Sequence, residues 1–475
     1  MSYYKAPPKP LLWRLRSQER RFILLIGDFT MSTVALVTAL WVWAQTDQWL
    51  SFSFQFLIER TPTWFYILPF VWIFLLSEIY DIRRASRRRD TVQGVGFAAA
   101  VSIGLYLILF FVSEPNALPR RGVAVFILVS SALTLLWRLF YIKIFTAPLF
   151  MRRVLIIGAG RAGSAFVKVI REMWPLPFFI TGLIDDDPDK IGCEIFGYPV
   201  LGGSTQLLQI IQQSNISDLI FAISGEMKPE MLSVLLEATE QGIEVNTMPV
   251  VYEDLLGRVP ILYLHSDWIL RSFTDHAQVS GVYEFVKRLI DLLGGLIGCI
   301  FTILTFPLIS LMIYFDSGGP VLYKQKRLGK NGEKHIIYKY RTMIKDAEKD
   351  GKAIPAVEND QRVTRVGRFL RKSHLDEFPQ FINVLRGEMS MVGPRAERLE
   401  LVEELQTKVP FYRARLLVKP GMTGWAQVNF GYASTVEDTT IKLEYDLYYI
   451  KHRNILLDFS IIIRTVGAVI GFKGQ

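Results

Sequence analysis

Residues 284–314 read EFVKRLIDLLGGLIGCIFTILTFPLISLMIY, an apolar stretch that carries Asp291 and Pro307. It is longer than the ~20 residues that a helix needs to cross the hydrocarbon core of a membrane. Basic residues flank it on both sides: Lys287, Arg288, Lys324, Lys326 and Arg327. Because basic flanks stay on the cytoplasmic side, both ends should lie there. We therefore expect a helix that is broken at Pro307 and forms a re-entrant hairpin over about 283–314.

Four more apolar stretches precede this segment, at about residues 22–44, 62–80, 94–113 and 122–146. Each is near the spanning length, and a hydrophobic share of 51% is too high for an ordinary soluble chain. Basic residues cluster before the first stretch and after the second: Lys5, Lys9, Arg14, Arg16, Arg20, Arg21, Arg83, Arg84, Arg87, Arg88 and Arg89. We predict a basic cytoplasmic segment over 1–21 and a bundle of four transmembrane helices over 22–149, with both ends in the cytoplasm. Asp28 is expected to reach the membrane interface.

The net charge of +9 fits either nucleic acid or the anionic face of a membrane. The basic residues gather beside apolar segments, and no basic stripe is interleaved with stacking aromatic residues as in proteins that bind single strands. The expected partners are therefore phosphates and a membrane surface, and not nucleic acid. Cys193 and Cys299 cannot form a disulfide framework. The histidines have no ligand spacing, which argues against a zinc site: His265, His276, His335, His374 and His452.

A glycine-rich turn follows the apolar run Val154–Ile157 in the middle of the chain. Its glycines have G-x-G-x-x-G spacing: Gly158, Gly160 and Gly163. In a βαβ unit this spacing gives a tight turn and offers a helix N-terminus to a phosphate. Asp185 ends the next strand, somewhat beyond the ~20-residue offset of a ribose-binding acid. We predict a Rossmann-like α/β domain over 150–262 and a linker over 263–281. Two hypotheses stay open for the turn. It binds a nucleotide, or it keeps the glycine spacing although the domain no longer binds one.

Two adjacent carboxylates, Asp376 and Glu377, stand in the densest run of candidate site residues. A carboxylate can attack phosphorus, but two anions repel each other unless cations neutralise the phosphoryl oxygens. Arginines recur every three residues just upstream: Arg362, Arg365, Arg368 and Arg371. On one helix they would fan across about half of the circumference, and the two carboxylates would diverge by about 100°. One carboxylate can then attack while the other holds a metal ion, and the alternative is a solvated acidic pair.

Blocks of sequence in this C-terminal part occur in a characteristic order. They are Lys287-Arg288 with Asp291, Gly319-Pro320-Val321, Arg327-x-Gly329-x-x-Gly332, Tyr338-Lys-Tyr-Arg-Thr-Met343, Leu375-Asp-Glu-Phe-Pro-Gln-Phe-Ile-Asn-Val-Leu385, Met389-Ser-Met-Val-Gly-Pro-Arg395, Lys419-Pro-Gly-Met-Thr-Gly-Trp-Ala-Gln-Val-Asn429 and Tyr445-Asp-Leu-Tyr-Tyr449. In these blocks, residues 282–475 resemble the catalytic domain of bacterial polyprenyl-phosphate hexose-1-phosphate transferases. These are monotopic phosphoglycosyl transferases that initiate exopolysaccharide, capsule or O-antigen synthesis. The whole chain is similar to their large branch, which transfers glucose or galactose phosphate.

The resemblance implies a ping-pong reaction at the cytoplasmic face of the bacterial inner membrane. Asp376 would take the sugar phosphate from a UDP-hexose and release UMP, and undecaprenyl phosphate would then accept the sugar phosphate. Glu377 would assist Asp376, and the two would bind Mg²⁺. The positions that match phosphate-binding residues are Lys339, Arg341, Arg371 and Arg395. The positions that match donor-binding residues are Gln427, Asn429 and Asp446.

The resemblance also implies a mixed α/β monotopic catalytic domain, with Lys287, Arg288 and Pro307 in its membrane hairpin. Apart from the resemblance, a regulatory or dimerisation role is expected for the middle domain, and the chain is expected to form a homodimer. Asn429 is followed by Phe430-Gly-Tyr-Ala433 where the family commonly has Gly-Arg-Asn, so the sugar is left open.

Two other functions are kept as alternatives. A NAD-dependent nucleotide-sugar dehydratase or epimerase would use the glycine-rich turn, and Tyr283 and Lys287 match the Tyr-x-x-x-Lys pair of short-chain oxidoreductases. Lys287, however, opens an apolar helix that is expected to lie in the membrane. No second substrate lobe follows that helix. A non-enzymatic membrane scaffold or sensor would use the middle domain for nucleotide sensing or dimerisation. The C-terminal blocks have no use in a pure scaffold.

Overall fold

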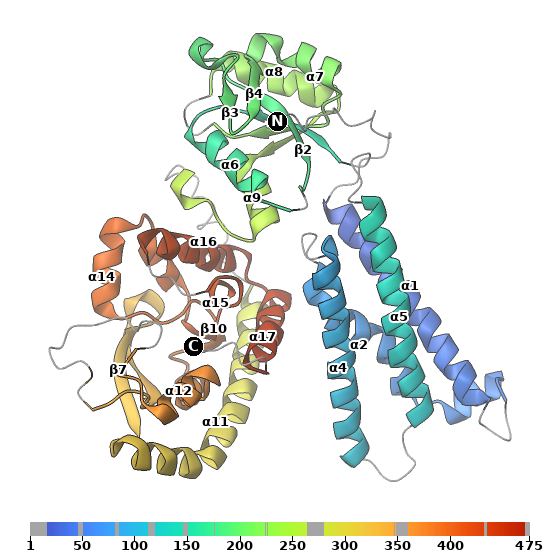
Figure 1. Ribbon diagram of the computed structural model, residues 1–475, viewed down its shortest axis with the longest axis vertical. Helices are drawn as coiled ribbons and strands as arrows, with labels where there is room; N and C mark the ends of the chain where they lie inside the picture. The colour runs from blue at the N-terminus through green and yellow to red at the C-terminus, as the bar shows by residue number, and fades with distance from the viewer. Residues whose placement is uncertain are drawn as a thin grey trace. The chain divides into compact units, whose positions relative to one another are not determined.

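The computed structural model describes residues 17–45, 51–80, 85–112, 119–145, 151–174, 176–223, 225, 227–263, 280–345, 347, 360–431 and 435–470. Two compact units make up the chain, Met1–Met248 and Pro249–Gln475 (Figure 1). Several residues of the sequence predictions lie outside the described ranges: Lys5, Lys9, Arg14, Arg16, Arg83, Arg84, His265 and His276. Most of the linker predicted over 263–281 lies outside them as well.

In the described part of the first unit, three helices are long and apolar enough to cross a membrane. They are α1 (Ser17–Ala44), α4 (Arg88–Val112) and α5 (Arg120–Phe145). α5 packs against both of the others (Figure 1). The first, third and fourth predicted apolar stretches are thus helices of spanning length, and the protein is a membrane protein.

The second predicted stretch, 62–80, is not one helix. After the π-helical turn η1 (Phe56–Arg60), it is divided into η2 (Thr63–Ile67), α2 (Leu68–Leu75) and η3 (Ser77–Tyr80). Pro69 has no backbone N–H and stands in the first turn of α2, so the regular helix begins there and not at residue 62. The apolar segment Thr63–Leu75 is shorter than the ~20 residues of a span. The expectation of a second long helix is therefore not met.

A buried ion pair joins these helices. Arg138 on α5 donates from Nη2 to Oδ2 of Asp28 on α1 at 2.7 Å, and neither side chain is exposed. The same guanidinium donates from Nη1 to the carbonyl oxygen of Ile79 at 2.9 Å, within η3. Because a charge in an apolar bundle is costly unless it is paired, this contact ties α1, α5 and η3 together. Asp28 was expected to reach the membrane interface. It instead faces the interior of the bundle.

The rest of the described first unit is an α/β domain on a six-stranded sheet. Its strands are β1 (Arg153–Ile157), β2 (Phe179–Ile184), β3 (Glu194–Ile195), β4 (Tyr198–Gly202), β5 (Asp218–Phe221) and β6 (Glu244–Thr247). Their order is β3-β4-β2-β1-β5-β6, and among these strands each pairing is parallel except that of β3 with β4. The parallel strands follow the order of a doubly wound sheet. The predicted α/β sheet domain is confirmed.

Three helices alternate with these strands in the described part of the domain: α6 (Arg161–Arg171), α7 (Leu207–Ser214) and α8 (Pro229–Glu240). Two short 3₁₀ turns complete it, η5 (Pro188–Lys190) and η6 (Ser204–Gln206). Leu155 and Ile157 of β1, Ile184 of β2 and Leu219 of β5 are buried in its core. Ile156, whose side chain points to the opposite face of β1, is buried as well, so apolar residues cover both faces of the sheet, as is typical of α/β folds.

The second unit begins earlier than the predicted catalytic domain. The sequence places α9 (Met248–Leu256) and η7 (Ile261–Tyr263) in the sheet domain, yet residues from Pro249 onward belong to the second unit. Val259 and Ile261 are buried in the core of that unit. The backbone N–H of Val259 also donates to the carbonyl oxygen of Glu444 at 3.1 Å. The boundary predicted at residue 262 is therefore corrected to about 248, because these apolar side chains pack on the second unit.

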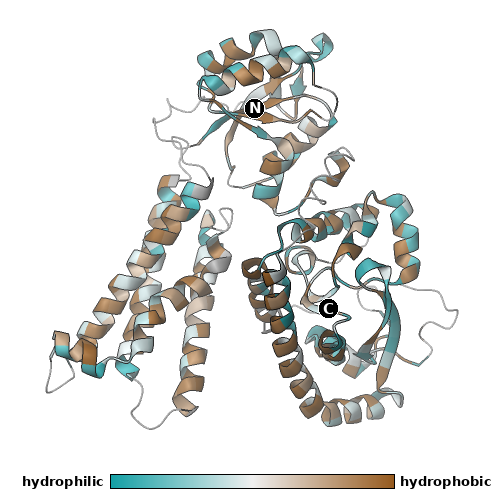
Figure 2. Ribbon diagram, turned by 180° about the vertical axis from the view of Figure 1, so that it is seen from behind, coloured by the Kyte–Doolittle hydropathy of each residue, from teal (hydrophilic) through white to brown (hydrophobic). Residues whose placement is uncertain are grey.

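The second unit combines helices with two short sheets in its described part, and thus has the mixed α/β composition that was predicted. Its elements after η7 are α11 (Gly281–Ser317), β7 (Leu322–Leu328), η8 (Lys330–Gly332), β8 (Lys334–Tyr340), α12 (Arg365–Lys372), η9 (Leu375–Gln380), α13 (Phe381–Arg386), β9 (Ser390–Val392), α14 (Leu399–Lys408), η10 (Tyr412–Leu417), β10 (Gly421–Thr423), α15 (Trp425–Asn429), α16 (Val436–His452) and α17 (Ile455–Ile470). β7 pairs antiparallel with β8, and β9 pairs parallel with β10. Figure 2 shows apolar residues concentrated along α11 and α17.

α11 is one continuous helix of 37 residues and not two helices joined by a loop. It contains Pro307 and changes direction part-way along its length (Figure 1). A proline inside a helix removes a backbone hydrogen bond and bends the helix without necessarily ending it. Before the proline, Gly298 lies directly against the ring of Phe381 on α13. After it, Ile309 packs in a cluster with Tyr340 of β8. Both halves of the bent helix therefore rest on the same folded unit.

The outer side of α11 is strongly apolar. Its exposed large side chains include Leu293, Ile297, Ile300, Leu304, Leu308 and Leu311. A soluble surface rarely exposes so many apolar side chains along one element. The length and composition of α11 also place it among the helices able to cross a membrane.

Candidate active site

Five of the predicted site residues come together in the second unit, from segments far apart in the sequence. Lys339 is on β8, Arg371 is in the last turn of α12, Asp376 and Glu377 are on η9, and Arg395 follows β9. Lys339 and Arg395 form direct ion pairs with Glu377. Arg371 acts on Asp376 through its charge. The fold thus assembles the cations that an adjacent pair of carboxylates requires.

The arginines that were predicted to share one helix do not all do so. α12 carries Arg365, Arg368 and Arg371, whereas Arg362 precedes the helix. Arg362 instead pairs with Asp360, at 2.6 Å between Nη2 and Oδ2. The helix therefore carries three of the four arginines, because Thr364 caps its start and leaves Arg362 outside.

A left-handed residue sets the direction of the two carboxylates. His374 has φ of 58°, which turns the chain out of α12 and into η9. Asp376 and Glu377 thus lie on a 3₁₀ turn and not on an α-helix. Adjacent side chains on a 3₁₀ turn diverge by about 120°, somewhat more than the 100° expected from the sequence. The two carboxylates therefore meet different surroundings.

Two cations hold Glu377. Its Oε1 accepts hydrogen bonds from Nζ of Lys339 at 2.7 Å and from Nη2 of Arg395 at 2.6 Å. The side chains of Lys339 and Glu377 are 16% and 15% exposed, whereas that of Arg395 is 41% exposed and opens to solvent. Burial opposes ionisation of Glu377, but the charges of Arg395 and Lys339 outweigh it and hold its pKa well below the usual range. Glu377 is therefore an anion in a fixed orientation.

The pKa of Asp376 is shifted in the opposite direction. Burial and the adjacent charge of Glu377 raise its pKa above the usual range of an aspartate, against the opposing charges of three nearby cations. One of these cations is Arg371, which is oriented by a hydrogen bond from its Nε to Oγ1 of Thr342 at 2.9 Å. Neighbouring carboxylates whose pKa values are pushed apart usually have different chemical roles. The two carboxylates thus differ in their surroundings, and the roles predicted for them, Asp376 as nucleophile and Glu377 as its support, stay predictions.

Three predicted cations serve the packing of the second unit. Arg341 donates from Nη2 to the carbonyl oxygen of Ser317 at 3.0 Å, and also to the carbonyl oxygen of Gly318, so that it caps the end of α11. Lys287 forms an ion pair with Asp458 of α17 at 2.9 Å. Arg288 donates to two carbonyl oxygens at the end of α13, those of Val384 and Leu385. The basic start of α11, expected to flank a membrane hairpin, therefore lies within the folded unit.

The predicted donor-binding residues have contacts away from the two carboxylates in the described structure. Asn429 accepts from Arg464 of α17 at 3.1 Å, and Gln427 donates to the carbonyl oxygen of Met422 at 3.4 Å. Asp446 is only 1% exposed and is paired with a buried arginine. Asp446 is therefore closed off from solvent by its ion pair, and a contact between Asp446 and the donor stays a prediction.

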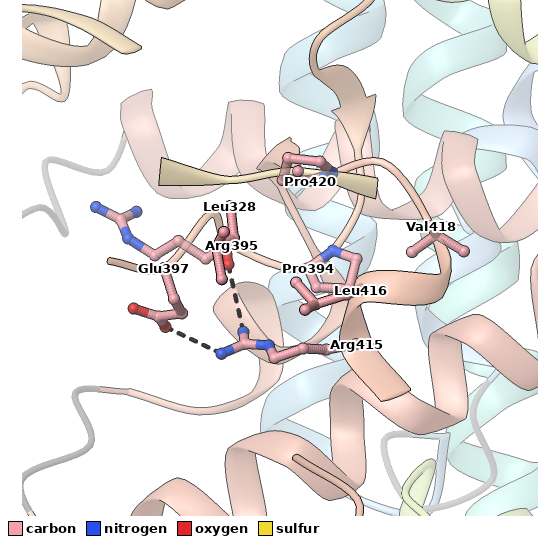
Figure 3. Close-up of a pocket in the computed structure, with 9 residues that line it drawn as sticks. Leu328, Pro394, Arg395, Glu397, Arg415, Leu416, Val418 and Pro420 are labelled. Carbon is pink, nitrogen blue, oxygen red and sulfur yellow. Dashed lines mark hydrogen bonds and ion pairs between the residues drawn. The ribbon is translucent and has the colours of Figure 1, made fainter. Parts of the chain in front are cut away.

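That arginine, Arg415, and its second partner, Glu397, were not predicted from the sequence. In Figure 3 the guanidinium of Arg415 points toward the carboxylate of Glu397 and the backbone of Arg395, beside a small pocket that Leu328 and Pro420 also line. Arg415 donates from Nη1 to Oε1 of Glu397 at 3.2 Å. The only local signal was the position of Glu397, two residues after Arg395. Nothing in the sequence around Arg415 indicates that it is buried.

The glycine-rich turn of the sheet domain is shaped by packing. Gly158 has φ of 106°, which favours glycine, and a Cβ on Gly163 would collide with the carbonyl oxygen of Gly158. Gly160 is the N-cap of α6. The carboxylate of Asp185 accepts from the backbone N–H of Ala159 at 2.7 Å, so it closes the turn from within. These contacts explain the pattern without a ligand, and a nucleotide at this turn stays a prediction.

Comparison with known proteins places this site in a family. Residues 282–472 match the family described as bacterial sugar transferase, and residues 75–249 match a family described as CoA-binding domain. A UDP-glucose:undecaprenyl-phosphate glucose-1-phosphate transferase of Klebsiella pneumoniae is 32% identical over 338 residues, which cover 68% of this chain and 68% of that relative. The chain belongs to the bacterial sugar transferase family. It is therefore an enzyme, a sugar-phosphate transferase.

Other relatives of this sugar transferase are named for other sugars. A UDP-N-acetylgalactosamine-undecaprenyl-phosphate N-acetylgalactosaminephosphotransferase of Aeromonas hydrophila is 40% identical over 235 residues, 49% of this chain and 54% of that relative. A UDP-galactose-lipid carrier transferase of Erwinia amylovora is 30% identical over 345 residues, 69% of this chain and 70% of that relative. The chain thus spans little more than half of the Aeromonas relative. Membership of the family does not name the sugar.

Magnesium is expected at the two carboxylates of this sugar transferase. Among the described residues, no group of three or more His, Cys, Asp or Glu side chains is placed to hold a metal ion. Mg²⁺, however, is usually held by one or two carboxylates together with water and substrate phosphates. Lys339 and Arg395 both donate to Oε1 of Glu377, so its Oε2 and the carboxylate of Asp376 are the oxygens that would meet the ion. The donor set therefore fits Mg²⁺ in combination with a phosphate substrate.

Proposed function

We propose that this sugar transferase moves a sugar 1-phosphate from a UDP-sugar to undecaprenyl phosphate through a covalent phospho-sugar on Asp376, with release of UMP. The observation that carries the proposal is the asymmetry of the carboxylate pair. Lys339 and Arg395 hold Glu377, which places two cations beside Asp376 without bonding them to it. The names of relatives support the substrates, because they combine UDP-sugars with undecaprenyl phosphate.

In the first step, a carboxylate oxygen of Asp376 attacks the phosphorus atom that carries the sugar. The bond between that phosphorus and the bridging oxygen of the diphosphate breaks, and its electron pair leaves with UMP. Negative charge on the phosphoryl oxygens is offset by Lys339, Arg371 and Arg395. Glu377 acts through two of these cations, because its carboxylate fixes their position before the substrate arrives.

In the second step, a phosphate oxygen of undecaprenyl phosphate attacks the same phosphorus atom. The bond to Asp376 breaks, the carboxylate is restored, and the sugar leaves on undecaprenyl diphosphate. The same three cations offset the charge, because the same phosphoryl oxygens are involved. Mg²⁺, when bound, would supply further positive charge at these oxygens. The product is the lipid-linked sugar with which a polysaccharide such as an exopolysaccharide, capsule or O-antigen begins.

The bent helix α11 supports a site at the cytoplasmic face of the bacterial inner membrane. Lys287 fixes the start of α11 to Asp458, and Arg341 fixes its end through Ser317. Both anchors belong to the second unit, so a helix held in this way dips into one leaflet and returns. The exposed apolar side chains of α11 then meet lipid, and the polyprenyl tail of the acceptor lies beside them. UDP-sugars reach the second unit from the cytoplasm.

The alternative as a NAD-dependent dehydratase or epimerase finds no support in the residues that prompted it. Tyr283 donates from its hydroxyl group to Oδ2 of Asp458 at 2.9 Å, and Lys287 donates to the same oxygen at 2.9 Å. The pair that resembled an oxidoreductase site therefore anchors α11 to α17. A homodimer and a regulatory role for the sheet domain stay predictions.

The test is UMP release by the full chain in detergent or nanodiscs, with undecaprenyl phosphate and Mg²⁺. The panel consists of UDP-glucose, UDP-galactose and UDP-N-acetylgalactosamine, the sugars named in the relatives. We expect at least one sugar to support release that depends on the acceptor for continued turnover, and Asp376→Asn to abolish it. Release of no UMP from any of these donors would overturn the proposal for this panel of sugars, and normal turnover by Asp376→Asn would overturn the role of Asp376.

A further inference from the structure

Arg415 is a buried cation that the chemistry proposed above does not use. It lies on η10, is 4% exposed, and donates from Nη2 to Oδ2 of Asp446 on α16 at 2.7 Å. Its Nη1 donates to the hydroxyl group of Tyr412 at 2.7 Å and to Oε1 of Glu397 at 3.2 Å. The planar guanidinium presents several donors in a fixed geometry, so one side chain can join three segments at once.

The segment that Arg415 holds is the one that carries Arg395. Nη2 of Arg415 donates to the carbonyl oxygen of Arg395 at 3.4 Å, and Nη1 reaches Glu397 two residues later (Figure 3). On the other side, the backbone N–H of Gly421 in β10 donates to the carbonyl oxygen of Pro394 at 2.9 Å. The backbone at residue 395 is thus fixed from both sides. Its side chain leaves this support to reach Glu377 at 2.6 Å.

We propose that Arg415 is a positioning residue, which sets the reach of Arg395 to Glu377 by tying the segment 394–397 to Asp446 of α16. The inference rests on the proposed function, in which Arg395 and Glu377 organise phosphoryl transfer. It gives Asp446 a role different from the donor contact that the sequence indicated. Asp446 orients Arg415, and Arg415 orients Arg395.

Glu397 strengthens the same connection. Its Oε1 accepts from Nζ of Lys442 on α16 at 3.1 Å as well as from Arg415. Burial opposes ionisation of Glu397, but the charges of Lys442 and Arg415 outweigh it and lower its pKa to about 2. Glu397 is therefore an anion across the physiological pH range, and α16 is tied to the segment 394–397 through two cations.

Lysine cannot replace this arginine. Lys keeps the positive charge, but a single nitrogen cannot reach Asp446, Glu397 and the carbonyl oxygen of Arg395 in the same geometry. Arg415→Lys therefore separates charge from positioning. A matched control is Arg413→Lys, because Arg413 lies on the same 3₁₀ helix and is exposed.

The experiment is a double-mutant cycle on UMP release by the full chain, with Arg415→Lys and Arg395→Lys alone and together. We expect Arg415→Lys to lower the rate by roughly ten- to a hundredfold, since misplacement of a catalytic group by about 1 Å has such an effect. In the Arg395→Lys background the same change should cost less than about threefold, because the group being positioned is already altered. Arg413→Lys should stay within about twofold of the wild type.

A purely structural role for Arg415 gives a different result. Arg415→Lys would then lower the rate by the same factor in both backgrounds, in step with its unfolding temperature, and the inference would be wrong. If Arg415→Lys releases UMP as fast as an active wild-type chain, the inference is also overturned, while the proposed function is left intact. A wild-type chain that releases no UMP would overturn both. If Arg415→Lys does not fold, Glu397→Gln removes one connection, leaves Asp446 paired, and permits the same cycle.

Discussion

Replacement of Lys339 by methionine removes one of the two cations that hold Glu377 and keeps an unbranched side chain of similar length. The hydrogen bond that is lost joins two largely buried groups over 2.7 Å, with side chains that are 16% and 15% exposed. A hydrogen bond to a charged group contributes about 1.5–3 kcal/mol. Because about 1.36 kcal/mol corresponds to a tenfold change in rate, its loss from the transition state predicts a rate lower by roughly 10- to 150-fold. Arg395 still holds Glu377, so we expect a value in the lower half of this range.

The assay is UMP release from the preferred UDP-sugar with undecaprenyl phosphate at saturating concentrations. Lys334→Met is the matched control, because Lys334 is an exposed residue at the other end of the same strand. The control should stay within about twofold of the wild-type rate and keep the wild-type unfolding temperature in detergent. Lys339→Met loses one partner of a buried ion pair and should unfold at a lower temperature, so the rates are compared at a temperature at which both variants are folded. If Lys339→Met releases UMP as fast as Lys334→Met, the cation beside Glu377 does not contribute to the reaction, and the reasoning from this ion pair is refuted.

Three further predictions concern the pH dependence, the packing and the topology. Because the pKa of Asp376 is raised, its carboxylate takes up a proton at a higher pH than an ordinary aspartate does. As the pH is lowered, the first burst of UMP should already decline above about pH 4, and a flat profile down to that pH contradicts this. Gly298→Ala places a methyl group against Phe381, so we expect a loss of about 1–3 kcal/mol in stability, measured as a lower unfolding temperature; an unchanged temperature contradicts the packing. Single cysteines at Glu284 and Lys324, in a chain without native cysteines, should both react with an impermeant maleimide only from the cytoplasmic side; labelling from opposite sides would show that α11 spans the membrane.

The sequence was most informative where function depends on residue type and order. Asp376, Glu377, Lys339, Arg371 and Arg395 were all proposed from the sequence, and the fold brings them together. Local patterns also predicted the α/β sheet and the long apolar helices, because periodicity and glycine spacing report directly on backbone geometry. The adjacent carboxylates alone carried little information. Their cations come from three other segments, and only the resemblance indicated which ones.

The sequence was least informative where a charged residue is used inside the fold. Arg341, Lys287 and Asp446 look like surface or substrate-binding residues, yet each is bonded to another group of the second unit. Arg415 and Asp446 are 31 residues apart in the sequence, and no local pattern links them. The same holds for Val259, which packs on the second unit although its neighbours in sequence lead out of the sheet domain. Such pairings depend on tertiary contacts that a single sequence does not display.

The covalent step is tested most directly by the mass of the intact protein after the first half-reaction. The full chain is mixed with its UDP-sugar and Mg²⁺ in the absence of undecaprenyl phosphate. We predict that each chain gains the mass of one sugar 1-phosphate group, releases one UMP, and carries the added group on Asp376, whereas Asp376→Asn gains nothing. No gain of mass in an enzyme that turns over only when both substrates are present, or an adduct on a residue other than Asp376, would contradict the account.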